Sequence, residues 1–453
     1  MSSVINFINK FSDFQEKICI IDNNNIYTYL DLIKSIDTNY EILKKNNIKP
    51  GELVALVGDY SFHSISFFFA LCKNNNVLIP ITTKNNQEIV DRIEEAKPEW
   101  VFHLDNKSFI KNQENFNSNR HDLIQNVINK KSSGLILFSS GTTGRPKAMI
   151  HDLSNLISSY ADKKQKSIVF LVFLMFDHIG GLNTLFNCLA MGSTIVIPLN
   201  RTPQHICQLI EKYNINVLPS SPTFLNLILI SKEYANYKLS SLKLITYGTE
   251  AMPDSLLLKL KDIFPNVKFL QTFGTSETGI AKTTSKSSTS TFIKIEDGDQ
   301  EYKIVNNELW LRSKTQILGY INHNNDSFTS DGWFKTGDLV EEMEGNYIKI
   351  RGRIKEIINV GGEKVTPSEV ESTILELPEL IDCVVVGEAN SITGQMVVAK
   401  VVISEDYEEL VVKKIIKKHC KERLDKYKIP AKILFIKQID FSERFKKERF
   451  NKE

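Results

Sequence analysis

Phe138-Ser-Ser-Gly-Thr-Thr-Gly-Arg-Pro-Lys147 directly follows the apolar run Gly134-Leu-Ile-Leu-Phe138 and combines two glycines, four hydroxyl side chains and a lysine. Glycine lets backbone N–H groups approach anionic oxygens, the hydroxyls add donors around them, and the lysine supplies a point charge. The stretch therefore predicts a strand that leads into a polyphosphate-binding loop. The candidate residues of this loop are Ser139, Ser140, Gly141, Thr142, Thr143, Gly144 and Lys147.

A P-loop NTPase is one alternative, and it requires Gly-Lys-Ser/Thr at the end of the loop. Here Pro146 precedes Lys147 and Ala148 follows it, which argues against that class. A surface turn is the second alternative, because clusters of Ser, Thr and Gly after a strand are commonly turns. The loop alone leaves this second alternative open.

Length and composition limit the kind of protein. A chain of 453 residues exceeds one ordinary core and predicts two or three domains. The net charge of +2 gives no global indication of nucleic-acid binding. Between residues 411 and 453, however, fifteen Lys and Arg outnumber six Asp and Glu. That excess suits either a solvated face or a surface for an anionic partner, such as a nucleotide or an acidic carrier protein.

The six cysteines lie far apart, with no Cys-x-x-Cys pair and no metal-ligand spacing with the eight histidines. We expect them to be reduced and mostly in the core. The N-terminus lacks the apolar core of a signal peptide. The strongest apolar run, residues 168–176, is far shorter than the ~20 residues of a membrane helix. These features predict a cytoplasmic protein with no membrane span.

Strands and helices alternate through the first three quarters of the chain, which predicts an α/β fold with mostly parallel sheets covered on both faces. Ligands then bind at the carboxyl ends of the strands. Polar residues at 105–133 and 283–291 predict a surface connection and a flexible loop. The predicted strands are 53–57, 76–80, 168–176, 194–197, 216–218, 244–247 and 267–270, and helices with proline in the first turn are predicted at 203–213 and 253–264.

The pattern changes after Arg351. Thr366-Pro-Ser-Glu369 predicts a capping box that opens a helix to about Leu377. Strands at 383–387, 396–403 and 433–436 and a basic helix at 408–424 complete an α+β unit of common domain size. We therefore divide the chain into residues 1–350, a hinge at 351–355 and residues 356–453, because a short charged segment with a glycine suits a hinge.

Three further motifs carry groups that suit a nucleotide. Phe273-Gly-Thr-Ser-Glu-Thr-Gly279 offers an aromatic face, a hydroxyl and the carboxylate of Glu277, an oxygen ligand that Mg²⁺ prefers. Asp338, at the end of Trp333-Phe-Lys-Thr-Gly-Asp338, could accept two hydrogen bonds from a ribose diol, although a turn aspartate is the commoner explanation of such a residue. Gly361-Gly362, within residues 351–365, predicts a hairpin turn.

In this order the motifs resemble the adenylate-forming superfamily of acyl-CoA synthetases, non-ribosomal peptide adenylation domains and luciferases. The resemblance runs from Gly134 to Arg449, about two thirds of the chain. It implies a large N-terminal domain with a small β-barrel-like subdomain, followed by a small mobile α+β domain. It also implies that Phe273 stacks on adenine beside Gly274 and Ser276, that Glu277 coordinates the Mg²⁺ of ATP, that Asp338 binds the ribose, and that Arg353 contacts the nucleotide.

The resemblance extends to the C-terminal part. It implies that Lys355 is the hinge pivot, that Gly361 and Gly362 line a tunnel for the thiol arm, and that Lys446 is the catalytic lysine. A cation between a carboxylate and the α-phosphate offsets their repulsion and stabilises developing charge. Phe445 stands where the family has glycine, as does Ala148. Lys447, beside Lys446, leaves the register open, and a solvated basic tail is the alternative.

A substrate pocket is implied near Asp177 and His178. Adenylation domains for amino acids use an aspartate at the Asp177 position to hold the substrate ammonium, whereas a histidine facing the pocket favours an uncharged fatty or aryl acid. A helix-capping Asp177 beside a core His178 is the structural alternative. Residues 248–253, which include Gly248 and Thr249, and residues 219–223 are expected to line the same pocket, and Thr275 is a further candidate.

The implied function is ATP-dependent activation of a carboxylic acid through an acyl-adenylate, with pyrophosphate release and transfer to a thiol. Three hypotheses remain. The first is an acyl-CoA ligase for a fatty or aryl acid, and the second is a stand-alone ligase that loads an acyl or amino acid onto the phosphopantetheine of a carrier protein. The third is an ATP-binding pseudoenzyme, motivated by Phe445 and Ala148. The expected cofactors are ATP, Mg²⁺ and CoA or carrier phosphopantetheine, and no nucleic-acid partner is expected.

Overall fold

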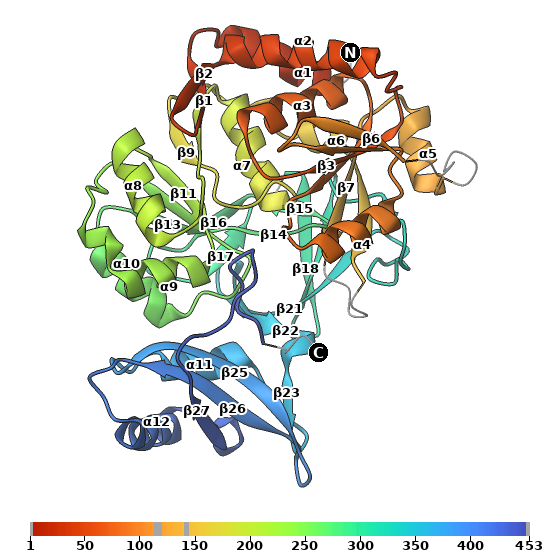
Figure 1. Ribbon diagram of the computed structural model, residues 1–453. Coiled ribbons are helices and arrows are strands. Elements are labelled where there is room, and N and C mark those ends of the chain that lie inside the picture. Colours follow the sequence, from red (N-terminus) through yellow and green to blue (C-terminus); the bar gives the residue numbers. More distant parts are fainter. Residues whose placement is uncertain (1–2, 113–119, 140–144, 297, 450–453) are drawn as a thin grey trace.

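The computed structural model describes residues 3–112, 120–139, 145–296 and 298–449, and Figure 1 shows them as a larger upper part and a smaller lower part. Ser140, Gly141, Thr142, Thr143 and Gly144 of the predicted phosphate loop lie outside the described residues. Across the described residues, every helix is too short or too polar to cross a lipid bilayer. All six cysteines are buried free thiols, as their spacing predicts.

The first seven-stranded sheet of the described chain is parallel except at one edge, where β1 pairs antiparallel with β2. Its order is β13 (Lys268–Gln271), β12 (Leu244–Tyr247), β11 (Val217–Ser220), β9 (Val169–Leu171), β10 (Thr194–Ile197), β1 (Ile18–Asp22) and β2 (Asn25–Thr28). The predicted strand at 168–176 is thus much shorter than expected, because the chain leaves the sheet after Leu171.

A second seven-stranded sheet has a parallel centre and antiparallel edges. Its order is β20 (Gly319–Tyr320), β8 (Lys147–Asp152), β7 (Gly134–Ser139), β4 (Val77–Ile81), β3 (Leu53–Val57), β5 (Trp100–His103) and β6 (Ser108–Lys111). The polar stretch 105–133, predicted to be a surface connection, contains β6 and helix α5 (Asp122–Asn129). The apolar Ile124 and Val127 of this helix are buried, and they hold it against the sheet.

Helices cover both faces of the two sheets, which confirms the predicted fold class. One apolar cluster joins the facing sides of the sheets, while separate clusters cover the outer side of each. The joining cluster includes α1 (Ser3–Asn9), α2 (Tyr29–Lys45), α3 (Phe62–Lys73), α6 (Leu153–Ser158) and α7 (Ile179–Ala190). The outer helices are α8 (Pro203–Tyr213), α9 (Pro222–Ser231) and α10 (Asp254–Ile263) on the first sheet, and α4 (Asn86–Ala96) and α5 on the second.

A six-stranded antiparallel sheet occupies the place of the implied barrel-like subdomain. Its order is β16 (Thr283–Ser285), β17 (Ile293–Ile295), β22 (Tyr347–Arg353), β21 (Phe334–Met343), β19 (Glu308–Ser313) and β18 (Gln300–Val305). The stretch 283–291, predicted to be a flexible loop, therefore begins with an edge strand. The hairpin β14 (Phe273–Thr275) and β15 (Gly279–Ala281) precedes this sheet.

The lower part in Figure 1 is built on a five-stranded sheet with its own apolar cluster. Its strands are β23 (Ile358–Val360), β24 (Glu363–Val365), β25 (Leu380–Asn390), β26 (Gly394–Ile403) and β27 (Lys432–Phe435), and its helices are α11 (Pro367–Ile374) and α12 (Glu409–Arg423). The capping box at Thr366 was wrongly predicted, because the Thr366 side chain makes no cap hydrogen bond and Glu369 pairs with Lys428 at 2.8 Å.

The position of Gly181 in α7 gives a test of this packing. Alanine normally stabilises a helix interior relative to glycine by about 1 kcal/mol. A methyl group at Gly181, however, would overlap the backbone oxygen of Met175, whereas one at Gly180 would meet side chains of Leu174 and His178. We expect Gly181→Ala to lower the free energy of unfolding by about 1–3 kcal/mol, as overpacking does.

Thermal unfolding followed by circular dichroism measures this effect, with Gly180→Ala as the matched control. Gly181→Ala should melt several degrees below both the wild type and the control. A Gly181→Ala protein that melts at or above the wild-type temperature would show that α7 does not pack as described.

Candidate active site

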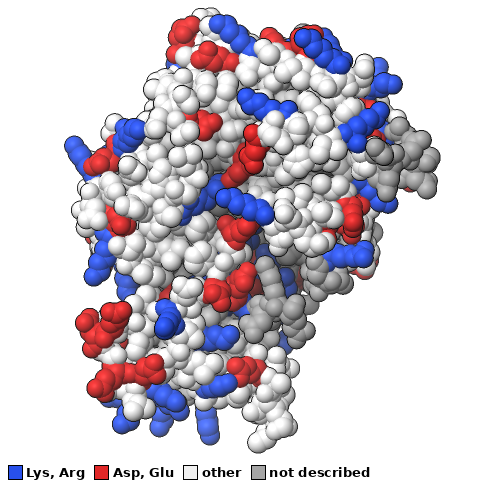
Figure 2. Space-filling model, in the orientation of Figure 1, with Lys and Arg blue, Asp and Glu red and all other residues white. Residues whose placement is uncertain are grey.

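A cavity of about 270 Å³ lies between the two parts of the molecule. Its walls come from the segments after β12 and β13, from β14 and β21–β22, and from α11 and the C-terminal tail. Figure 2 shows acidic and basic side chains interspersed over one face of the molecule. The sequence-predicted residues that line the cavity are Gly248, Thr249, Phe273, Gly274, Asp338, Arg353, Lys355 and Lys446.

Backbone crowding explains the glycines at the ends of the first sheet. A methyl group at Gly248 would lie 2.8 Å from the backbone oxygen of Thr272, and one at Gly274 would overlap the backbone oxygen of Gly279. Thr249 has φ +72°, a left-handed conformation that is costly for a β-branched residue. Within the described chain the buried Thr249 hydroxyl has no hydrogen-bond partner. Strain and an unsatisfied hydroxyl at a cavity wall are features of a binding site.

Asp338 and Arg353 face each other across the β21–β22 pair. Their Cα atoms are register partners, and Arg353 Nε donates to Asp338 Oδ1 at 3.1 Å. Burial raises the pKa of Asp338, and the positive charge of Arg353 opposes that shift. The two side chains thus offer a carboxylate and a guanidinium side by side to a polar ligand in the cavity.

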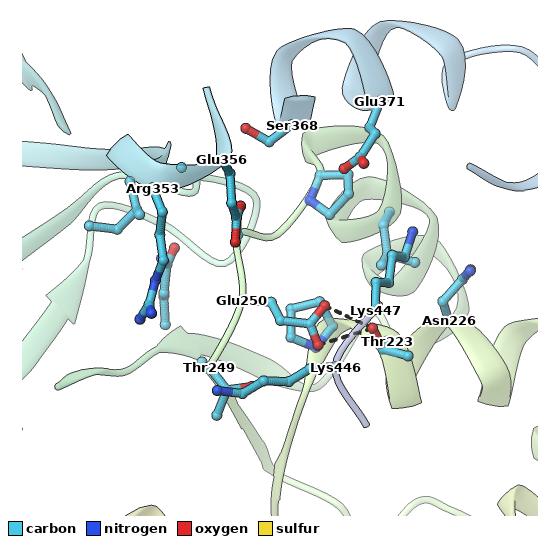
Figure 3. Close-up of a pocket in the computed structure, with 18 of the residues that line it drawn as sticks. Thr223, Asn226, Thr249, Glu250, Arg353, Glu356, Ser368, Glu371, Lys446 and Lys447 are labelled. Carbon is cyan, nitrogen blue, oxygen red and sulfur yellow. Dashed lines mark hydrogen bonds between the residues drawn. The ribbon is translucent and has the colours of Figure 1, made fainter. Parts of the chain in front are cut away.

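Lys446 reaches the cavity from the tail, and in Figure 3 it extends into the same space as Thr249 and Glu250. Desolvation and the positive charges of Arg353 and Arg444 lower the pKa of Lys446 to about 8, while Glu250 and Asp338 act in the opposite direction. A lysine held among like charges in a half-buried position is arranged to meet an anion.

Ion pairs of the residues that follow Lys446 help to fix its position. Lys447 Nζ donates to Asp382 Oδ1 at 2.6 Å and to the backbone oxygen of Cys383 at 2.8 Å. Arg449 forms a bidentate pair with Glu371. Because Lys447 is held by the smaller part, Lys446 is the residue whose charge is directed to Arg353, Glu250 and Asp338.

Glu250 lines the cavity and belongs to residues 248–253, which were predicted to line the pocket, but no role was predicted for its own side chain. Thr223 Oγ1 donates to its carboxylate at 2.8 and 3.0 Å, the pair of contacts drawn in Figure 3. Burial raises the pKa of Glu250, although Thr223 and the two neighbouring lysines of the tail oppose the shift. The contact of Thr223 with Glu250, and the approach of the tail lysines to that carboxylate, could not be predicted because these residues meet only in the fold.

The described ends of the phosphate loop lie outside the cavity lining. Ser139 and Lys147 are paired at the ends of β7 and β8. Lys147 Nζ lies 5.8 Å from the centre of the Tyr320 ring, and the Tyr320 hydroxyl donates to Glu277 Oε1 at 2.8 Å. Tyr320 thus connects the loop lysine with the predicted metal carboxylate.

Asp177 is not a free carboxylate. It is almost fully buried and its Oδ2 accepts from Arg92 at 2.6 Å and from Arg444 at 3.1 Å. Burial alone would raise the pKa of Asp177, but the two guanidiniums lower it to about 2. The alternative in which Asp177 caps a helix is wrong. The residue that caps α7 is His178, whose Nδ1 accepts a hydrogen bond from Gly180 N.

His178 lines a second, very small void of about 10 Å³. Desolvation and the charges of Arg444 and Lys446 lower the pKa of His178 to about 3, so this imidazole is neutral at neutral pH. Thr249 and Lys446 line both this void and the large cavity, so the two spaces adjoin.

The remaining predicted residues lie elsewhere. Gly361 and Gly362, with φ +62° and +96°, form the tip of the β23–β24 hairpin, where left-handed conformations favour glycine. Neither glycine lines the large cavity, and neither do Thr275 and Ser276. The Thr275 hydroxyl lies 3.1 Å from that of Thr278. The cavity therefore unites Phe273, Gly274, Asp338 and Arg353 with Lys446 of the tail, whereas the other described residues predicted for the nucleotide and the glycine hairpin do not line it.

Comparisons with known proteins agree with this architecture. Probable CoA ligase CCL5 of Humulus lupulus is 26% identical over 449 residues, which cover 85% of this chain and 81% of the plant protein. Acyl-CoA synthetase 7 of Caenorhabditis elegans is 30% identical over 332 residues, which cover 67% of this chain and 61% of the worm protein. The crystal structure of the anthranilate CoA ligase AuaEII with anthranoyl-AMP has the same fold, with a TM-score of 0.80 and 19% identity over 98% of this chain and 94% of that one.

Two family models also match in sequence order. The model described as AMP-binding enzyme matches residues 8–320, and the model described as AMP-binding enzyme C-terminal domain matches residues 369–446. The first alone spans more than half of the chain, so this protein belongs to the AMP-binding enzyme family, within the adenylate-forming superfamily that its motifs resemble.

Proposed function

We propose that this protein activates a carboxylic acid with ATP, releasing pyrophosphate, and transfers the acyl group from the acyl-adenylate to CoA. The observation that carries the proposal is the meeting of Lys446 with Asp338 and Arg353 in one cavity between the two parts. The names of two relatives, a probable CoA ligase and an acyl-CoA synthetase, support CoA as the acceptor. The acid is an uncharged fatty or aryl acid, since neutral His178 faces the adjoining void and Asp177 is already paired with two arginines.

In the first half-reaction the residues of the cavity bind and orient the nucleotide. Phe273 offers its ring to adenine, Asp338 accepts hydrogen bonds from the ribose, and Arg353 lies beside Asp338 to contact the nucleotide. A carboxylate oxygen attacks the α-phosphorus, the bond to the β-phosphate oxygen breaks, and pyrophosphate leaves. Lys446, as a cation between the two anions, offsets their repulsion and stabilises the charge that develops on the phosphoryl oxygens.

Glu277 is the candidate residue for Mg²⁺. Within the described residues no cluster of three or more His, Cys, Asp and Glu could hold a metal ion. One carboxylate suits Mg²⁺ nonetheless, because phosphates and water commonly supply its remaining ligands. Bound there with ATP, Mg²⁺ would neutralise phosphate charge, while Tyr320 fixes the orientation of the Glu277 carboxylate through a 2.8 Å hydrogen bond.

The second half-reaction needs a different arrangement of the small part. We propose that it rotates about residues 351–355, with Lys355 at the pivot, so that Lys446 leaves and the Gly361–Gly362 hairpin lines the path of the thiol. The thiol sulfur then attacks the acyl carbonyl, its proton passes to solvent, and AMP leaves. Such a rotation is a gating motion of the kind that limits turnover in many enzymes.

A carrier protein is the second candidate acceptor, and helix α12 favours it. This helix carries Lys413, Lys414, Lys417, Lys418, Lys421 and Arg423. A basic helix on the mobile part would attract an acidic carrier by electrostatic steering.

Acid-dependent ATP–pyrophosphate exchange tests the proposed function directly. A panel of fatty, aryl and amino acids should give exchange with a fatty or aryl acid, and added CoA should then yield the acyl-CoA by mass spectrometry. ATP–pyrophosphate exchange without an acyl-CoA product would favour a carrier protein as the acceptor. ATP binding without exchange for any acid would contradict the activity.

Lys446→Ala should abolish adenylation but spare transfer. We expect exchange to fall by about 10²–10³-fold, the effect of losing one donor to a developing charge. Thioester formation from supplied acyl-adenylate should stay within a few fold of wild type, because Lys446 is absent from that arrangement. Equal loss of both half-reactions would refute the role.

Lys447→Ala serves as the comparison for the register. Its side chain is held by Asp382 and the backbone of Cys383. It should lower thermal stability more than Lys446→Ala does, while retaining more exchange activity.

The pH dependence of the exchange reaction should report Lys446. Its pKa is lowered to about 8, so the charged form predominates below that pH and is lost above it. We therefore expect kcat/KM for ATP to fall as pH rises through about 8, since kcat/KM reports the free enzyme. Lys446→Arg should keep its residual activity to higher pH, because arginine stays protonated. A wild-type profile that is flat to pH 9.5 would contradict the assignment.

A further inference from the structure

Phe445 has an unusual conformation for its residue type. Its φ of +52° lies in the left-handed region, which glycine adopts without steric cost and phenylalanine does not. A tight turn holds it there: Phe445 N donates to Ser442 O at 2.8 Å, and Ser442 N donates to Lys446 O at 2.9 Å. A strained aromatic residue next to the candidate catalytic lysine invites a functional explanation.

The ring of Phe445 packs into the larger part of the molecule. Its centroid lies 5.2 Å from those of Phe173 and Phe224, and Phe441 stacks on it at 5.4 Å from its own tail segment. Phe173 and Phe224 belong to the core cluster on the first sheet, and Phe445 packs against that cluster. Aromatic pairs at these distances are stabilising, so the ring anchors the tail on the larger part.

The same ring closes the space beyond Lys446. The large cavity, at about 270 Å³, is lined by Phe273, Asp338 and Arg353, the residues proposed to bind the nucleotide. With the nucleotide there, the acyl group of the acyl-adenylate, bonded to the α-phosphate beside Lys446, would extend into the adjoining void, which Phe445 lines with Phe173, Leu174, Met175 and His178. That void measures about 10 Å³, no more than a single water molecule needs.

We propose that Phe445 sets the upper size limit of the acid, so that this protein activates short carboxylic acids of a few carbon atoms. The inference rests on the proposed function and narrows its substrate. A longer acyl chain would have to displace the Phe445 ring from between Phe173 and Phe224. Because Lys446 is the next residue in the chain, displacing that ring also withdraws the lysine from the α-phosphate. Size is thus selected in the adenylation step itself.

Arg444 strengthens this coupling from the other side of Phe445. Its guanidinium lies 3.1 Å from the buried Asp177 Oδ2, and like Phe445 it lines the void. Three consecutive residues therefore carry an ion-pair anchor, an aromatic anchor and the lysine. Movement of one along the short tail cannot be independent of the others.

Phe445→Gly is the sharpest variant, because glycine keeps the left-handed turn while it removes the ring. Phe441→Ala is the matched control, since it removes an equally large ring of the same segment that lines neither space. ATP–pyrophosphate exchange is measured for the wild type and both variants with straight-chain acids from acetate to octanoate.

Wild-type kcat/KM should be highest for the shortest acids that bind and should fall at least about tenfold for octanoate, the scale on which pockets reject extra methylenes. Phe445→Gly should shift the optimum to longer acids, and Phe441→Ala should keep the wild-type order. A wild-type preference for octanoate over the short acids, or identical size profiles for wild type and Phe445→Gly, would overturn the size limit.

Hydrogen exchange of residues 440–449 in the enzyme without substrates supplies a readout independent of activity. Phe445→Gly should exchange faster than wild type across this segment, whereas Phe441→Ala should change less. Equal protection of this segment from hydrogen exchange in the wild type and Phe445→Gly would show that the Phe445 ring does not anchor the tail. Silence of ATP–pyrophosphate exchange with every acid would instead overturn the proposed function, and the size limit with it, even where hydrogen exchange supports the anchor.

Discussion

The clamping of the C-terminal tail to both parts of the molecule is the constraint on which the site depends. Arg444 pairs with Asp177 of the larger part, while Lys447 and Arg449 pair with Asp382 and Glu371 of the smaller part. Buried charges need partners, because removing one partner from a buried pair costs about 3–5 kcal/mol. Lys446 lies between these clamps, so its position is set by the ion pairs around it.

This clamp explains how two separately packed parts share one cavity. The first sheet brings Gly248, Thr249 and Phe273 to the carboxyl ends of its strands, and the six-stranded sheet adds Asp338 and Arg353. The tail adds the positive charge of Lys446. The proposed rotation of the smaller part must break the Arg444–Asp177 pair, but Asp177 keeps Arg92 as its partner and Arg444 returns to water, which offsets part of the cost. The two proposed half-reactions can therefore alternate without unfolding either part.

Periodic segments of the fold were predictable from sequence. The helix 203–213 and the strand 53–57 agree with the structure residue for residue, since proline and apolar runs mark them locally. Helix α5 and strands β6 and β16 were missed because their surroundings are polar, and only a few apolar residues anchor them. The Thr366 capping box was predicted wrongly because the Glu369 carboxylate pairs with Lys428, 59 residues further along the chain.

The candidate site was likewise predictable from sequence only in part. Phe273, Asp338, Arg353 and Lys446 were selected from sequence motifs and meet in one cavity, whereas Lys147, Glu277 and the Gly361–Gly362 hairpin, from the same set of motifs, do not line it. Residues 248–253 were predicted to line the pocket, but the role of Glu250 among them was not. The pairing of Asp177 with Arg92 and Arg444 was not predicted either, because these contacts join residues 85 and 267 positions apart. The register at the tail also needed the fold, in which Lys447 is bound by the smaller part and Lys446 faces the cavity.

The central claim is that a nucleotide occupies the cavity while the tail is clamped. A crystal structure of the enzyme with a non-hydrolysable ATP analogue and Mg²⁺ tests it most directly. The account predicts adenine against Phe273, ribose at Asp338, Lys446 Nζ beside the α-phosphate, and the Arg444–Asp177 pair intact. A nucleotide bound elsewhere, or bound in this cavity with Lys446 remote from the phosphates and Arg444 released from Asp177, would contradict it.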